Sequence, residues 1–279
     1  WLKGGRGVHG IEGNPMRQEG VYIIAEAGVN HNGDERRALD LVDAAAASGA
    51  DIIKFQTFTG SRLASAIAPK AAYQLLNTDA SVNQVEMLTS LEMSDRMHQL
   101  IISRAQESEI EFLSTAFHEN NLDYLVRLGI QRIKVPSGEI TNLPFLRHLG
   151  AQGLPVLLST GMANLGEIEA AIEVLELAGT VRDNITVLHC TTEYPAPMDE
   201  VNLTAMVSIG QSLRVSVGYS DHTLGSEVAI AAVALGATVI EKHITLDRAL
   251  PGPDHEASME PDDFAGMVKS IRAVEEAMG

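Results

Sequence analysis

Several features that would assign the chain to a compartment or a binding class are scarce in its 279 residues. Its one cysteine, Cys190, can form no internal disulfide, so a reducing, cytoplasmic setting is expected. Aromatic residues are only 4% of the chain, and no apolar run reaches the roughly 18 residues that a membrane helix needs. Basic residues are outnumbered 37 to 20 by acidic ones, and the net charge of −17 argues against binding to nucleic acid or anionic membranes.

The first fifteen residues, WLKGGRGVHGIEGNP, are rich in glycine and lack a starting methionine. We interpret residues 1–15 as a flexible arm added ahead of a native start at Met16, with a genuine N-terminal arm as the alternative. Residues 16–279, with a hydrophobic content of 45% for the whole chain, are long enough for one large domain with a substantial core. We expect a single domain there.

Short, continuously apolar runs predict eight strands that are buried on both faces. These runs are Val21–Ala25, Asp51–Phe55, Glu111–Ser114, Arg132–Val135, Pro155–Leu158, Asn184–Leu188, Arg214–Val217 and Thr238–Ile240. Amphipathic segments such as RRALDLVDAAAASGA and NLGEIEAAIEVLELAG alternate with them and predict helices. The alternation predicts an α/β fold, a closed (β/α)8 TIM barrel. A doubly wound open sheet is the alternative, but the first turn, AEAGVNHNG, lacks the G-x-G-x-x-G fingerprint.

One connection, from Thr59 to Met93, shows no simple strand or helix pattern. A segment of this length inside a compact domain is typical of a lid or a binding loop. It follows the second strand, so in a barrel it lies on the active-site face. It contains YQLLN, in which Asn77 is a candidate substrate contact.

Polar residues stand at the end of every predicted strand, where a barrel carries its catalytic groups. In chain order these include Glu26, Lys54, Gln56, Ser114, Thr115, Lys134, Ser137, Glu139, Ser159, Thr160, His189, Thr191, Thr192, Tyr194, Ser220, Asp221, His222, Glu241, Lys242 and His243. A single serine or histidine at a strand end is usually a hydrogen-bonded cap. Lysines, hydroxyls, carboxylates and histidines together at one rim indicate a site for an anion and a metal.

Two of these residues are lysines set among apolar strand residues, Lys54 in DIIKFQ and Lys134 in RIKVPSG. A buried ammonium group is costly unless an anion compensates it, and a phosphate would do so. Neighbouring hydroxyls could donate to the same anion: Thr115, Ser137, Ser159 and Ser220. The alternative is that each lysine forms a structural ion pair with Glu26 or Glu139.

Two histidines, His222 and His243, stand at the ends of the last two predicted strands. These strands are neighbours in a barrel, so the two imidazoles could converge on one divalent ion. Two protein ligands leave positions open for substrate and water, as a catalytic metal requires. The alternative is a pair of ordinary hydrogen-bonded histidines. His255, in the loop that follows, is expected to be a supporting or surface group.

Seven motifs, in order, resemble the N-acetylneuraminate (sialic acid) synthase family, which includes legionaminate-type nonulosonate synthases. They are IIAEAGVNHNGD, ADIIKFQTF, KVPSGEITN, LLSTGMA, LHCTTEYPAP, VGYSDHTLG and GATVIEKHITLD. The resemblance runs from about Val21 to Ala273. It implies a (β/α)8 barrel that condenses phosphoenolpyruvate with an N-acylated mannose-type sugar and releases phosphate by C–O cleavage. It also implies a divalent metal, Mn²⁺ or alternatively Mg²⁺ or Co²⁺, and a homodimer.

The resemblance implies a role for individual residues. His222 and His243 correspond to metal ligands. The residues that correspond to phosphoenolpyruvate contacts are Lys54, Thr115, Lys134, Ser137, Ser159 and Ser220, with Tyr194 nearby. Glu26, Gln56 and Asp254 correspond to sugar contacts, and Glu26 is also a candidate catalytic group. Glu139 corresponds to the residue that transfers protons near the reacting carbons.

Two departures from the family pattern bear on the sugar. Thr192 stands where sialic acid synthases tend to have asparagine, which favours a diacetamido-trideoxy sugar of the legionaminate type. Members of the family normally continue into a small C-terminal antifreeze-like domain, which supplies an acceptor-binding arginine to the partner subunit. This chain stops after the last predicted helix, so we expect it to bind phosphoenolpyruvate and metal well but the sugar weakly.

The sequence leaves two other functions as alternatives. Another phosphoenolpyruvate-dependent 2-keto sugar acid synthase would act on a phosphorylated sugar, and the sequence shows no extra basic residues for a second phosphate. A non-catalytic, sugar-binding barrel would not need every catalytic position to be filled.

Overall fold

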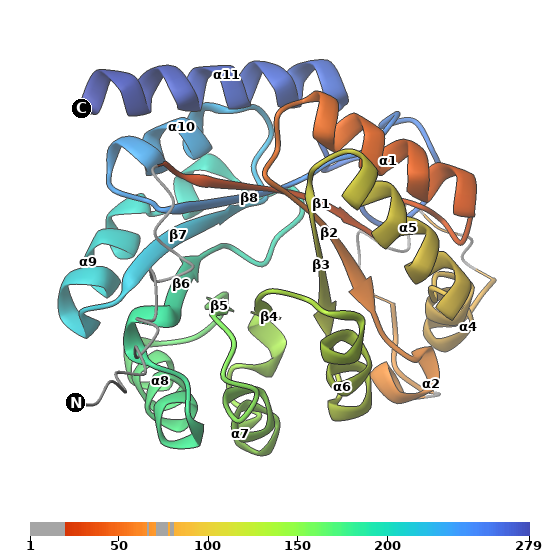
Figure 1. The fold of residues 1–279 in the computed structure, drawn as a ribbon, viewed down its shortest axis with the longest axis horizontal. Coiled ribbons are helices and arrows are strands. Elements are labelled where there is room, and N and C mark those ends of the chain that lie inside the picture. The colour runs from red at the N-terminus through yellow and green to blue at the C-terminus, as the bar shows by residue number, and fades with distance from the viewer. Residues whose placement is uncertain (1–19, 66, 71–77, 79–80) are drawn as a thin grey trace, which may run out of the picture.

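The computed structural model describes residues 20–65, 67–70, 78 and 81–279 (Figure 1). The expectations for residues 1–15, for a start at Met16 and for Asn77 therefore fall outside the described residues. No described helix is long and apolar enough to cross a membrane.

Eight parallel strands form the sheet, in the order β3-β2-β1-β8-β7-β6-β5-β4. Their bounds are β1 Tyr22–Gly28, β2 Ile52–Thr57, β3 Glu111–Ala116, β4 Ile133–Val135, β5 Val156–Ser159, β6 Ile185–His189, β7 Ser216–Asp221 and β8 Val239–His243. Each strand follows its neighbour around the ring, and helices surround them (Figure 1). The predicted (β/α)8 barrel is confirmed, and every predicted strand is present, most of them with one to four further residues at the C-terminal end.

One helix follows each strand and covers the outside of the barrel (Figure 1). These helices are α1 Glu35–Ala47, α5 Asp95–Glu107, α6 Glu119–Leu128, α7 Leu143–Gly150, α8 Leu165–Ala178, α9 Leu203–Leu213, α10 Glu227–Ala234 and α11 Pro261–Met278. Polar residues directly before several of these helices determine where the helices begin. The side chains of Asp34, Ser94 and Asn164 accept hydrogen bonds from the first turns of α1, α5 and α8.

The described parts of the long connection after β2 contain helices that the sequence did not predict. These are two short helices, α2 Gly60–Leu63 and α4 Gln84–Ser90. Helix α4 begins with a capping box, in which Asn83 accepts from the backbone N–H of Glu86 and the Glu86 carboxylate accepts from that of Asn83. The apolar face of α4 packs beside Val29 and Phe58. Neither helix has enough residues to show a helical period in the sequence, which explains why they were not predicted.

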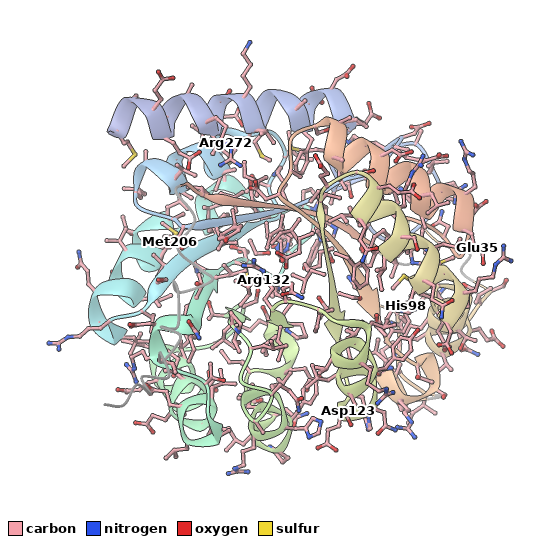
Figure 2. The ribbon with its side chains drawn as sticks, in the orientation of Figure 1. Glu35, His98, Asp123, Arg132, Met206 and Arg272 are labelled. Carbon is pink, nitrogen blue, oxygen red and sulfur yellow. The ribbon has the colours of Figure 1, made fainter. Side chains whose placement is uncertain are left out.

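The apolar core lies mostly between the sheet and the helices, in two large clusters. A third cluster fills the lower part of the barrel itself, with Tyr22, Ile24, Ile52, Leu113, Leu157, Leu188 and Val239. Arg132 lies directly before β4 and pairs with Glu111 at the start of β3, with Nε to Oε1 at 2.7 Å (Figure 2). This pair joins the two strands at the ends of the hydrogen-bonded order, and the Arg132 guanidinium also lies 4.6 Å from the centre of the Tyr22 ring.

Candidate active site

Strand parity decides which side chains enter the barrel, because successive residues of a strand point to opposite faces. On β1 the inward residues are Tyr22, Ile24 and Glu26, so two apolar layers lie beneath a carboxylate. On β8 the same parity turns Glu241 and His243 inward. Apolar side chains therefore close the bottom of the barrel, and ionisable ones form the floor of a cavity above them.

The floor is a buried ionic layer of two lysines and two glutamates. Lys54 Nζ lies 2.7 Å from Glu26 Oε2 and 3.4 Å from Glu241 Oε2. Lys134 Nζ lies 3.2 Å from Glu241 Oε1. Each of these four side chains is about 95% buried or more. The ion pairs considered from the sequence are thus partly present: Lys54 pairs with Glu26, but the partner of Lys134 is Glu241 and not Glu139.

Hydroxyl groups border the same layer. Lys54 Nζ donates to Thr115 Oγ1 at 3.2 Å, and Lys134 Nζ donates to Ser159 Oγ at 2.7 Å. Ser220 Oγ donates to Glu241 Oε1 at 2.8 Å. These contacts use the same residues that the sequence predicted as donors to a phosphate.

The two glutamates have opposite pKa shifts. Burial raises the pKa of Glu26 to about 7, and the nearby Lys54 only partly offsets this. Burial also acts on Glu241, but the ammonium groups of Lys134 and Lys54 outweigh it and hold the pKa of that carboxyl well below its usual range. Two ammonium groups therefore face one carboxylate that stays ionised and one that titrates near neutral pH. When Glu26 is protonated, the two ammonium groups outnumber the one ionised carboxylate, so the charge of the layer favours binding of a further anion.

A cavity of about 300 Å³ opens above this layer. Of the predicted site residues that the structure describes, all but Glu139 line it: Glu26, Lys54, Gln56, Thr115, Lys134, Ser137, Ser159, Thr192, Tyr194, Ser220, His222, His243 and Asp254. Glu139 lies in the 3-10 turn Ser137–Glu139, and its carboxylate accepts a hydrogen bond from Asn142 Nδ2 at 2.6 Å. The residues predicted from eight strand ends thus meet at one cavity.

The two histidines lie side by side at the upper edge of the cavity, with ring centres 5.7 Å apart. His222 Nδ1 is 2.5 Å from the carbonyl oxygen of Thr191. A carbonyl oxygen only accepts, so Nδ1 holds the proton and Nε2 keeps its lone pair. His243 Nδ1 is buried and has no hydrogen-bond partner in the described part of the chain.

Both imidazoles are held in the form that binds metals. Burial lowers the pKa of His222 to about 4, and burial together with His222 lowers that of His243 well below its usual value. Neutral rings with free lone pairs fit a divalent cation. Within the described residues no group of three histidine, cysteine or acidic side chains is arranged to hold a metal. The remaining ligands would have to be substrate and water oxygens.

Asp254 approaches the cavity from the loop between β8 and α11. Burial raises the pKa of its carboxyl to about 6, and no described residue donates a hydrogen bond to that carboxyl. Gly28 allows the Asp254 side chain to lie close to β1 and β2. A Cβ at Gly28 would lie 3.3 Å from Glu26 Oε1 and from Gln56 Nε2 and 3.6 Å from Asp254 Oδ2, and Gly28 has a φ of +52°. A glycine here lets three polar side chains meet above the barrel.

The opposite wall of the cavity is apolar, which sequence reasoning missed. It consists of Val29, Met87, Leu88, Leu91 and Phe117, most of them from α4 and its surroundings. The only signal was the length of the connection after the second strand. Glu241 was also assigned no role, although its parity with His243 on the last strand placed it inside the barrel.

Comparison with known proteins decides the family. A model described as the NeuB family matches residues 41–279. The chain belongs to the NeuB family. It is 52% identical to N,N'-diacetyllegionaminic acid synthase from Campylobacter jejuni, covering 93% of this chain and 78% of that protein. It is 48% identical to the protein of the same name from Legionella pneumophila, covering 92% and 73%. The family that the sequence motifs predicted is thus confirmed, and with it a synthase of sialic or legionaminic acid type.

Solved structures agree with this family assignment. The structure of N-acetylneuraminic acid (sialic acid) synthetase from Leptospira borgpetersenii, in complex with citrate, matches with a TM-score of 0.84 at 33% identity. The match covers 93% of this chain and 85% of that one. The barrel of this chain is therefore the barrel of a NeuB-family synthase.

Proposed function

We propose that this chain condenses phosphoenolpyruvate with an N-acylated mannose-type sugar to give a nine-carbon 2-keto acid and inorganic phosphate. The observation that carries the proposal is the ionic layer of Lys54, Lys134, Glu26 and Glu241 beneath the His222–His243 pair in one cavity. It places an anion site and a site for a cation in the same cavity. The family match supports it.

Phosphoenolpyruvate is assigned to the floor of the cavity. The hydroxyl of Ser220 gives its one proton to Glu241 and so is not free to donate to the substrate. Lys54 and Lys134 would neutralise the phosphate and carboxylate, and the hydroxyls of Thr115 and Ser159, which accept from these lysines, would add neutral donors. These donors are already oriented by buried hydrogen bonds, so they need little rearrangement when charge develops. Binding an anion also relieves the cost of burying two ammonium groups.

A divalent cation, Mn²⁺ in our assignment, with Mg²⁺ or Co²⁺ as alternatives, is assigned to His222 and His243. When bound, it would supply Lewis-acid polarisation of the aldehyde oxygen of the open-chain sugar. Tyr194 lies against both rings, 4.2 Å from the centre of His222 and 5.8 Å from that of His243, and restricts their rotation.

The sugar is assigned to the space between Asp254 and the apolar wall. Asp254, Gln56 and Glu26 offer hydrogen-bonding groups on one side. Met87, Leu88 and Leu91 offer an apolar surface on the other, which suits the methyl and acetyl groups of a diacetamido-trideoxy sugar. The legionaminate-type relatives support this acceptor.

The proposed reaction forms one carbon–carbon bond and breaks one carbon–oxygen bond. C3 of phosphoenolpyruvate forms a bond to the aldehyde carbon, whose oxygen becomes a hydroxyl. Water adds to C2, and the tetrahedral intermediate then breaks its C2–O bond, so that phosphate leaves with the bridging oxygen and C2 becomes a ketone. Glu26 is positioned to transfer protons, because its carboxyl lines the cavity and its pKa of about 7 suits both uptake and release. The role predicted for Glu139 stays a prediction.

A homodimer and a cytoplasmic location also stay proposals. Two other functions are less well supported. A synthase for phosphorylated sugars would need a second cationic site, and Lys54 and Lys134 are the cavity's only lysine or arginine side chains among the described residues. A non-catalytic sugar-binding barrel would have no use for a buried ionic layer that is costly to form.

The test is to incubate the protein with phosphoenolpyruvate, Mn²⁺ and either N-acetylmannosamine or its diacetamido-trideoxy analogue, and to measure phosphate. Phosphoenolpyruvate carrying ¹⁸O in the bridging position distinguishes the bond that breaks. We expect sugar-dependent release of phosphate that retains the label. Unlabelled phosphate would mean P–O cleavage and would contradict the mechanism, and release without sugar would contradict the condensation.

A further inference from the structure

The motif Asn30–His31–Asn32, directly after β1, has no part in the reaction proposed above. None of its side chains lines the cavity. Asn30 and His31 are nevertheless almost completely buried, with 1% and 0% of their surface exposed. The motif faces the loop between β8 and α11, which holds Asp254.

Asn30 joins the two ends of that loop. Its Nδ2 donates to the carbonyl oxygen of Ile244 at 2.9 Å and to Ser258 Oγ at 2.9 Å. Ile244 is the residue after β8, and Ser258 lies fourteen positions later, where the chain returns to the barrel. The orientation of the amide is determined by chemistry, because the carbonyl of Ile244 can only accept. Asn30 Oδ1 has no partner among the described residues, so the side chain is used as a donor.

Ser258 connects Asn30 to Asp254. Its hydroxyl accepts from Asn30 and donates its one proton to the carbonyl oxygen of Asp254, 2.6 Å away. Two consecutive buried hydrogen bonds therefore connect the amide of Asn30 to the backbone of Asp254. The Asp254 carboxylate projects from that backbone toward Gly28 and the cavity.

Asn32 makes a second attachment nearer the middle of the loop. Its Nδ2 donates to the carbonyl oxygen of Pro251 at 2.6 Å, and its Oδ1 lies 3.3 Å from His255 Nε2. His255 Nδ1 is in turn 2.7 Å from Thr245 Oγ1. Asn32 has a φ of +50°, a conformation that asparagine tolerates better than most residues. His255 is 1% exposed, so it is a buried support of the loop, as one of its two sequence interpretations held.

We propose that Asn30, Asn32 and Ser258 are positioning residues that hold Asp254 against the acceptor sugar. They fasten the β8–α11 loop to the turn after β1, and so determine how well the sugar is bound without touching either substrate. The inference rests on the proposed function for the identity of the sugar. The two halves of the site are then held in different ways. The anion floor is built on strands, whereas one wall of the sugar site is a loop held by the side chains of Asn30, Asn32 and Ser258.

The test compares Ser258→Ala with Ser208→Ala, a matched control. Ser208 Oγ also donates to the carbonyl oxygen four residues earlier, that of Thr204 at 3.0 Å, but on the exposed side of α9. For Ser258→Ala we expect the KM for the sugar to rise about tenfold, the size of effect expected for one or two lost buried hydrogen bonds. The KM for phosphoenolpyruvate and the kcat at saturating sugar should change less than about twofold. Equal changes in both KM values would overturn the proposal.

A double-mutant cycle shows whether the effect passes through Asp254. In an Asp254→Ala background, Ser258→Ala should raise the KM for the sugar no further, because the group it positions is gone. An additive increase would overturn the proposal. Asn30→Asp, which has the same shape but lacks the donor N–H groups, should behave like Ser258→Ala.

Amide hydrogen exchange separates a failure of this inference from a failure of the proposed reaction. Ser258→Ala should increase exchange in residues 245–258 and leave the strands unchanged, whereas Ser208→Ala should not affect that loop. If the unaltered protein releases no phosphate with either sugar, the proposed reaction is wrong and the loop attachment is judged by exchange alone. If it turns over normally but the loop exchanges equally in both variants, the attachment is wrong and the reaction stands.

Discussion

Two glutamates in the same buried layer have opposite protonation behaviour, and the reason is the number of cations beside each. Glu241 lies between Lys54 and Lys134, which keep it ionised. Glu26 has only Lys54 as a close partner, so burial dominates and its pKa rises to about 7. The first is suited to holding the lysines in place and the second to moving a proton.

His243→Ala should abolish phosphate release and tight Mn²⁺ binding while leaving the fold intact. The reason is that His222 alone would be left as a protein ligand, and one imidazole holds a divalent ion weakly. Binding is measured by titration of free Mn²⁺, and the fold by circular dichroism. His148→Ala, which removes a histidine paired with Asp123 at a partly exposed site, is the control. Unchanged Mn²⁺ affinity in His243→Ala would rule out the metal assignment.

Lys134→Met should weaken phosphoenolpyruvate binding by about 1.5–3 kcal/mol, the range for a hydrogen bond to a charged group. Methionine keeps the apolar stem packed but removes the ammonium that faces Ser159 and Glu241. Calorimetric titration with phosphoenolpyruvate measures the change, and Lys269→Met on the exposed side of α11 is the control. Normal binding by the variant would show that Lys134 has only a structural role.

At the scale of elements, strands β7 and β8 divide their residues between two tasks. Inward residues line the cavity, whereas the next residue on each strand points outward and forms a buried pair, Lys242 Nζ to Asp221 Oδ2 at 2.8 Å. Lys242 also donates to the carbonyl oxygen of Thr223, and Asp221 Oδ1 accepts from the N–H and hydroxyl of Thr223. Lys242 Nζ thus has two acceptors and both oxygens of the Asp221 carboxylate have donors, so the pair joins the strand ends that carry the two histidines.

Lys242→Met should lower the free energy of unfolding by about 3–5 kcal/mol, because it leaves the Asp221 carboxylate buried without its counter-ion. Adding Asp221→Asn removes that charge and keeps an acceptor for Thr223, so the double variant should recover a large part of the loss. Denaturant unfolding measures both. A double variant no more stable than the single one would show that charge is not the cause.

At the scale of the whole molecule, the acidic surface and the buried cations are kept apart. The chain as a whole has a net charge of −17, whereas the lysines of the cavity floor are buried inside the barrel. An anionic substrate is therefore bound by a local site and gains no help from the overall field. Because buried carboxyls have shifted pKa values, the free energy of unfolding of the whole fold depends on pH.

Asp254 should make the protein less stable as pH rises from about 4 to about 6. Its folded pKa of about 6 lies above the model-peptide value of 3.8, so the folded state binds the proton more tightly in that window. The loss is at most about 3 kcal/mol and is complete above pH 6. Asp254→Asn cannot titrate, so its stability relative to the unaltered protein should rise across the same window. Unfolding free energies at several pH values test this, and a constant difference would contradict it.

Most of the barrel could be predicted because its signals are local. Continuous apolar runs mark strands buried on both faces, and Asp34, Ser94 and Asn164 mark helix starts. Helix α4 could not be predicted, because seven residues show too little periodicity and its stability comes from packing beside Val29 and Phe58. The apolar wall of the cavity was missed for the same reason.

The sequence by itself determined the order of strands, the family and the set of residues at the strand ends, because these depend on residue type and spacing along the chain. Only the tertiary structure decided which of those residues act together. The ion pair considered as the alternative for Lys134 was with Glu26 or with Glu139, five residues away, but its partner is Glu241 on a strand across the barrel. Asn30 and Ser258, 228 positions apart, meet for the same reason: closing the barrel brings the first strand beside the last, and no local pattern records that contact.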